Sequence, residues 1–153
     1  MQQTYRQLID QFCALTGLDD PDDIAEGKSF NVDEVECAVI YQDQISPELV
    51  YCYIDFGLPP GNLLIEVYDQ LLQANYLQLA STKSTFSLSP HTGHVILVSV
   101  VQLQEATAEL LTDQFSYHAQ QALEWRNHFF LTGSEGPAAS NAETPFSNRS
   151  PLV

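Results

Sequence analysis

Apolar side chains recur with a helical spacing in three parts of the chain. In residues 4–16 they fall at every third or fourth position, which predicts an amphipathic helix that ends at Gly17. Residues 62–79 and 105–131 show the same spacing and predict two further helices. His118 lies on the apolar stripe of the last helix, so we interpret it as a core histidine with a hydrogen-bond partner.

The segments between these helices have the patterns of strands and turns. Every second position is apolar in the clearest of them, and β-forming residues fill the others. An acidic stretch that contains a proline predicts a loop at residues 19–26, and a polar turn at residues 89–93 predicts a hairpin. The expected strands are residues 29–32, 35–41, 49–56, 85–88 and 95–101.

The predicted order of elements is therefore α-β-β-β-α-β-β-α. Strands that follow one another without regular βαβ alternation indicate an α+β fold with a twisted, largely antiparallel sheet packed by helices. We predict one domain over residues 1–131. Residues 132–153 are rich in Gly, Ser, Pro, Ala and Asn and contain few apolar residues, so we predict a disordered C-terminal tail.

The charge of the chain is strongly unbalanced. It has 20 Asp and Glu against 5 Lys and Arg, which gives a formal net charge of −15. Such a surface repels phosphate backbones and anionic lipids, so we expect neither a nucleic acid nor a membrane as partner. The charge would attract a basic polypeptide, and it would also serve to keep the protein in solution; the sequence leaves both interpretations open.

The sequence also predicts a cytoplasmic location. The N-terminus has no signal-peptide pattern, and the longest apolar runs are far shorter than the roughly 20 residues of a transmembrane helix. Cys13, Cys37 and Cys52 are odd in number and lie inside apolar patterns, so we expect reduced core thiols and no disulfide framework.

Residues that could carry catalysis or hold a metal are few. His91 and His94 have a metal-ligand spacing on a turn, but their neighbours supply no third ligand. The acidic cluster from Asp19 to Asp23 lacks the ligand spacing of a calcium loop, and Cys13 is not at a helix N-terminus. No phosphate-binding glycine motif occurs. We therefore expect no enzyme activity, no metal and no cofactor.

Three local strings, in this order, resemble the class I type III secretion chaperones, the Tir chaperone (CesT-like) family. The first helix carries Leu15-Thr16-Gly17-Leu18. The second ends in Leu72-Gln73-Ala74-Asn75, similar to the family's leucine–x–alanine–asparagine ending. The hairpin carries Leu88-Ser89-Pro90-His91-Thr92-Gly93, similar to the family's leucine–x–proline–x–threonine–glycine turn.

The resemblance implies a chaperone that binds the N-terminal segment of a secreted effector in an extended, secretion-competent state, without ATP. Hydrophobic grooves and addition of the effector as an extra strand at an edge near residues 29–32 would hold it. Each candidate position, taken alone, also fits a core role. The effector-binding residues expected on this basis are Tyr5, Leu8, Phe12, Leu15, Phe30, Val32 and Val39.

The same resemblance implies a twofold homodimer formed by the second helix and the strand after it. The second helix has more apolar width than one sheet contact needs, which is consistent with a second buried face. A buried Asn75 would need a partner across the interface or a backbone group to bind. The expected interface residues are Leu64, Val67, Tyr68, Leu71, Leu72, Asn75 and Phe86.

Two other functions stay open from the sequence. One is a cytosolic regulatory or sensory domain of the same fold, unrelated to secretion. The other is a small hydrolase, which would depend on His91, His94 and His118. The resemblance also leaves open a secretion ATPase as a second partner of the chaperone.

Overall fold

The computed structural model describes residues 1–78 and 83–131. The predicted tail, residues 132–153, and the last residue of the predicted second helix lie outside the described residues. The elements are α1 Gln2–Thr16, α2 Pro21–Ala25, β1 Phe30–Val32, β2 Val35–Tyr41, β3 Leu49–Gly57, η1 Gly61–Leu63, α3 Leu64–Gln78, β4 Ser84–Leu88, β5 Val95–Gln102 and α4 Ala108–His128.

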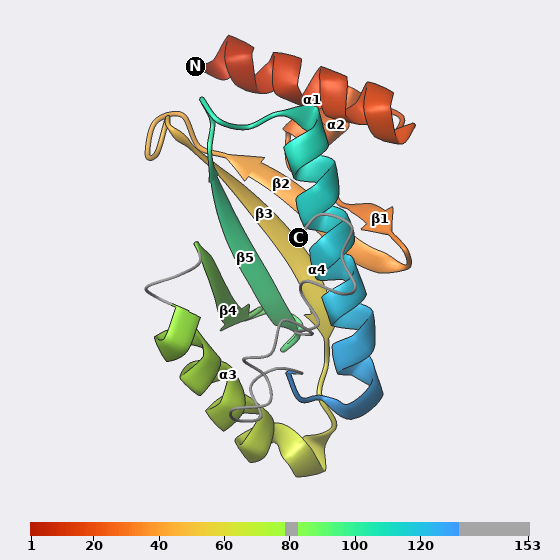
Figure 1. The fold of residues 1–153 in the computed structure, drawn as a ribbon, viewed down its shortest axis with the longest axis vertical. Coiled ribbons are helices and arrows are strands. Elements are labelled where there is room, and N and C mark those ends of the chain that lie inside the picture. Colours follow the sequence, from red (N-terminus) through yellow and green to blue (C-terminus); the bar gives the residue numbers. More distant parts are fainter. Residues whose placement is uncertain (79–82, 132–153) are drawn as a thin grey trace, which may run out of the picture.

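The five strands form one antiparallel sheet in the order β1-β2-β3-β5-β4. The long helix α4 runs along one face of this sheet, with α1 across one end and α3 beside β4 at the other (Figure 1). The predicted α+β class and the order of the long helices and strands are therefore confirmed. β1 and β4 are the two edge strands.

The core lies between the sheet and the helices. Alternate residues of the strands point into it, and Val39, Cys52 and Phe56 are fully buried there. Phe12 of α1 and Phe115 of α4 pack against Phe30, with ring centroids 5.6 and 5.1 Å from that of Phe30. The edge strand β1 is thus anchored to both helices by one aromatic side chain.

Residues 19–26 are not the loop that their acidic composition predicts. Pro21–Ala25 form the short helix α2, whose first position is Pro21. Proline suits this position because a helix does not use the N–H of its first residue. Asp22 and Asp23 in the first turn interact favourably with the helix dipole, and Ile24 enters the core.

The buried side of α4 differs from the predicted stripe at His118. Ala119 is fully buried where His118 was expected, and His118 lies at the flank of the stripe, half-buried. Its Nδ1 lies 2.8 Å from Gln121 Oε1, so it does have the predicted hydrogen-bond partner. The helix begins after Thr107, whose hydroxyl accepts a hydrogen bond from the Leu110 N–H.

Candidate functional site

The face of the sheet opposite α4 is apolar and partly accessible. In an antiparallel sheet with one covered face, the other face is normally polar. Here the outward positions of three central strands carry hydrophobic side chains that are half-buried or, at Tyr53, 36% exposed. We call this surface the open sheet face; it consists of Ala38, Ile40, Tyr51, Tyr53, Ile96, Val98 and Val100.

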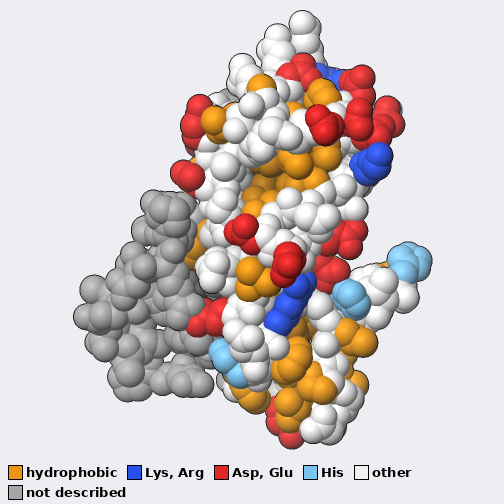
Figure 2. Space-filling view, turned by 90° about the vertical axis from the view of Figure 1, so that its right-hand side faces the viewer, with side chains coloured by type: hydrophobic (Ala, Val, Ile, Leu, Met, Phe, Trp, Pro, Cys, Tyr) orange, Lys and Arg blue, Asp and Glu red, His pale blue; other side chains and the backbone are white. Residues whose placement is uncertain are grey.

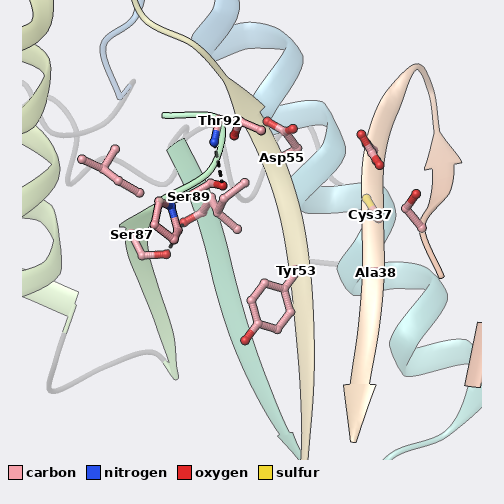
Figure 3. Close-up of a pocket in the computed structure, with 12 residues that line it drawn as sticks. Cys37, Ala38, Tyr53, Asp55, Ser87, Ser89 and Thr92 are labelled. Atoms are coloured by element: carbon pink, nitrogen blue, oxygen red, sulfur yellow. Dashed lines mark hydrogen bonds between the residues drawn. The ribbon is translucent and has the colours of Figure 1, made fainter. Parts of the chain in front are cut away.

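One end of the open sheet face is hollowed into a pocket of about 460 Å³. Figure 3 shows β2, β3, β5 and β4 in front of α4, with Tyr53 and Asp55 on β3 and Ser87 on β4 among the lining residues. The Ser89 hydroxyl accepts a hydrogen bond from the Thr92 N–H at the hairpin turn. We call this site the acidic pocket; the residues that define it are Glu36, Ala38, Tyr53, Asp55, Ser87 and Ile96.

The acidic pocket is tied to the hairpin turn by the contact between His94 and Asp55. His94 Nδ1 lies 2.8 and 3.0 Å from the two carboxylate oxygens of Asp55. Asp55 also accepts a hydrogen bond from the Gly57 N–H at 2.7 Å. On the opposite face, Arg126 of α4 donates to the main-chain carbonyls of Asp55 and Phe56. The end of β3 is therefore held from both faces.

The predicted effector-binding residues fall into two groups. Tyr5, Leu8, Phe12, Phe30 and Val39 are buried in the core of this chain and present little surface. Two of the predicted residues remain accessible: Leu15 at the end of α1, 53% exposed, and Val32 of β1, half-buried. The helical stripe alone did not show that Cys13, rather than Leu15, would complete the buried face of α1.

The predicted dimer residues differ in their exposure to solvent. Val67, Leu71 and Phe86 are buried inside the chain, Leu64, Tyr68 and Asn75 are half-buried, and Leu72 is 69% exposed.

Two neighbours of Leu72 on α3 were missed from the sequence. Ile65 is 83% exposed and Tyr76 is 77% exposed. Spacings of seven and four residues place these two side chains on one helix face with Leu72. We call this set, Ile65, Leu72 and Tyr76, the outer stripe of α3; the sequence signal was the presence of two apolar stripes on one helix.

Asn75 has the backbone partner that the sequence called for. Its side-chain amide donates to the Phe86 carbonyl at 2.9 Å, and its side-chain oxygen accepts from the Phe86 N–H at 2.8 Å. The asparagine thus satisfies both main-chain groups of one residue on the edge strand β4. This contact fixes β4 to α3 and directs the outer stripe of α3 away from the sheet.

Acidic side chains surround much of the remaining surface. Figure 2 shows apolar patches bordered by acidic residues on one side of the molecule. Two cations near α2 are already paired: Arg6 lies 2.9 Å from Asp22, and Lys28 lies 2.6 Å from Asp23. These exposed pairs neutralise only part of the local charge.

Burial and grouping decide whether the cysteines and the potential metal ligands are candidates for chemistry. Within residues 1–78 and 83–131, no cluster of three or more metal-ligating side chains occurs. Cys13, Cys37 and Cys52 are buried free thiols, and burial raises the pKa of Cys37 and Cys52 to about 12. Such thiols are not nucleophilic near neutral pH.

No helix in the described part of the chain is long and apolar enough to cross a membrane.

Comparison with protein families matches residues 7–126 to the Tir chaperone protein (CesT) family. A search of curated protein sequences found no match. The fold is similar to the solved ExsC–ExsE complex, with a TM-score of 0.65, 18% identity, and coverage of 84% of this chain and 96% of that chain.

Two other solved structures are similar in fold. One is the Yersinia pestis type III secretion chaperone SycH with a stable fragment of YscM2, at a TM-score of 0.54 and 18% identity, covering 78% of this chain and 98% of that chain. The other is the HopA1–SchA chaperone–effector complex, at a TM-score of 0.56 and 12% identity, covering 84% and 94%.

The match extends over most of the described residues, so the chain belongs to the Tir chaperone protein (CesT) family. It is therefore an effector-binding chaperone of the type III secretion class, as the sequence predicted.

Proposed function

We propose that this protein binds the N-terminal segment of a cognate secreted effector in the cytoplasm and holds it extended, without ATP and without chemistry on its cargo. The observation that carries the proposal is apolar surface left accessible on a body of net charge −15. An apolar patch on a soluble protein marks an interaction site. The strong charge keeps that protein in solution while the patch is free.

The edge strand β1 supports a specific binding mode. β1 pairs only with β2, so the groups on its other side are unpaired within the described chain. An extended peptide can add there as a further strand and gain main-chain hydrogen bonds. Phe30 anchors β1 in the core, and Asn31 points to solvent. The cargo strand would thus join a pre-formed edge.

Leu15 and Val32 are the predicted effector-binding residues that can contact such a strand directly. Leu15 is more than half exposed at the end of α1, and Val32 is half-buried on the edge strand. In this proposal, the buried residues Tyr5, Leu8, Phe12, Phe30 and Val39 hold α1 and the sheet in place beneath the cargo. They act through packing and do not touch the cargo.

We also propose that two copies associate through the outer stripe of α3. The exposed side chains of Ile65, Leu72 and Tyr76 project from the helix that lies beside the edge strand β4. A self-complementary patch of this kind suits a twofold interface, in which the same surface serves both partners. Leu72 thereby keeps its predicted role, and Ile65 and Tyr76 join it.

The test is co-expression with the N-terminal segment of the protein encoded by the adjacent gene. We expect the segment to become soluble and to co-purify with the chaperone. Leu15→Glu and Val32→Glu should each weaken the complex by about tenfold, because a charge at a binding hot spot removes about 1.4 kcal/mol or more.

Ile45→Glu is the matched control, since Ile45 is 75% exposed in the loop between β2 and β3. It should leave the complex unchanged. Equal binding by all three variants would refute the placement of the site. Failure of every candidate segment to bind the wild-type protein would refute the function.

A further inference from the structure

The acidic pocket places two carboxylates on neighbouring strands. Cys37 on β2 pairs with Ile54 on β3 in antiparallel register. Glu36 and Asp55 are the next residues beyond this pair on the two strands, and both line the same pocket. Two acidic side chains that line one pocket make it a negatively charged site.

The basic side chains in the described part of the chain leave Glu36 without an ion-pair partner. His94 is within ion-pair distance of Asp55, and Lys28 is engaged by Asp23. Arg126 reaches only main-chain carbonyls, from the far side of the sheet. Across the described residues, no cationic group lies within ion-pair distance of Glu36, which is exposed.

Besides the two carboxylates, the pocket is lined by apolar side chains, the Tyr53 ring and four serine and threonine residues. Ala38 and Ile96 lie on the open sheet face, and Tyr53 is 36% exposed there. The side chain of Tyr53 lies on the same strand as Asp55, two residues away (Figure 3). A ligand that filled this site would therefore have a long apolar stem and a cationic head.

We propose that the acidic pocket binds an arginine side chain of an extended cargo segment; this inference rests on the proposed function. The guanidinium group is planar and offers paired N–H donors that match a carboxylate. Its methylene stem covers apolar surface while the head stays at the rim, and the head can stack on the Tyr53 ring. The pocket would thus select cargo with an arginine among apolar residues.

The pocket can be tested with a defined probe that needs no knowledge of the cargo. Backbone amide NMR signals of the full-length protein would be followed during titration with N-acetyl-Val-Arg-Val-amide. The comparison peptide carries citrulline, which has nearly the same shape as arginine but no charge. We expect the signals of Tyr53, Asp55 and Ser87 to shift, and the arginine peptide to bind about threefold to fivefold more tightly at low salt.

Glu36→Gln is the diagnostic variant, because it removes the unpaired charge at an exposed position and keeps the side-chain shape. It should abolish the preference for arginine. Glu48→Gln makes the same change at an exposed residue just before β3, at the end of that strand away from Asp55, and should preserve the preference. Equal binding of the two peptides by the wild-type protein, or shifts confined to other residues, would overturn the proposal. Pocket signals that shift on dilution of the protein alone would assign the pocket to contacts between copies and would also overturn it.

The outcomes separate this inference from the proposed function. If an effector segment binds the chaperone with equal affinity before and after Glu36→Gln and arginine-to-citrulline replacement, the pocket assignment fails and the function stands. If the tripeptide binds in the pocket but no effector segment binds, the function fails and the arginine site stands.

Discussion

Asn75 and Phe86 are joined by two hydrogen bonds between one side chain and one main-chain unit. The asparagine amide takes the place that a neighbouring strand would occupy along β4, since it both donates to and accepts from the same residue. This accounts for a polar, half-buried side chain in the last turn of α3. Helix α3 and the edge strand β4 are therefore held together by these two hydrogen bonds.

Replacement of Asn75 should weaken the attachment of α3 to β4. Asn75→Ala removes both hydrogen bonds and leaves the Phe86 N–H and carbonyl without a protein partner. We expect the free energy of unfolding to fall by about 1–3 kcal/mol, measured by urea denaturation. Gln73→Ala removes an exposed hydrogen bond to Asp69 on the same helix and should change it by less than about 0.5 kcal/mol. Equal effects of the two substitutions would contradict the role of Asn75.

A charge on the outer stripe of α3 should separate the two copies. In Leu72→Glu, a carboxylate would replace a side chain that is 69% exposed in the single chain and buried in the proposed dimer. We expect sedimentation to give the mass of one chain, with an unchanged circular dichroism spectrum. The control Ile45→Glu should keep the mass of the wild-type protein. A wild-type protein that sediments as one chain at high concentration would rule out the dimer.

Arg126 should contribute more to stability than the exposed arginine of α1. Arg126 donates to the Phe56 carbonyl from Nε at 2.9 Å and to the Asp55 carbonyl from Nη2 at 2.8 Å. Arg126→Ala should lower the free energy of unfolding by about 2–3 kcal/mol, because charged donors make the stronger hydrogen bonds.

Arg6→Ala is the comparison for this effect. It breaks an exposed ion pair with Asp22 and should cost less than about 1 kcal/mol. Thermal unfolding of both variants tests whether Arg126→Ala loses more stability than Arg6→Ala. A larger loss in Arg6→Ala would show that the end of β3 is held by other contacts.

Stability should fall as the pH drops below about 6.5, in part through His118. Burial lowers the pKa of His118 below its ordinary value of 6.5, although the hydrogen bond with Gln121 opposes this shift. Between 6.5 and the lower folded pKa, the unfolded chain binds more protons than the folded chain, so acid favours unfolding. His118→Gln should reduce the dependence of the unfolding free energy on pH between neutral pH and pH 5. An identical pH dependence in the variant would contradict this assignment.

Much of the fold followed from the period of the apolar residues. The alternation in Val35–Tyr41 and the turn at Pro90 and Gly93 predicted the strands, because a sheet with a covered face needs every second side chain to be apolar. The short helix α2 escaped prediction. Its single buried side chain, Ile24, gives no period, and the acids around it are typical of a loop.

The surfaces were harder to predict than the elements. A second apolar face of the sheet was not predicted, although the nearly continuous apolar run of β5 places Ile96 and Val98 on the open sheet face. The meeting of Glu36 and Asp55 in one pocket depends on how β2 and β3 pair, and no spacing along the chain encodes it. The contacts of Leu15 and Val32 with cargo stay a prediction.

The helices that pack on the sheet leave the open sheet face uncovered. This face is an apolar surface in addition to the outer stripe of α3, on a protein with only five Lys and Arg side chains. Two empty molecules that approach through this face meet mutual repulsion before their apolar side chains touch, and dissolved salt shortens the reach of that repulsion. The negative charge of the chain therefore opposes self-aggregation through the open sheet face. A partly basic guest is attracted to the open sheet face, whereas a second chaperone dimer that approaches through this face is repelled.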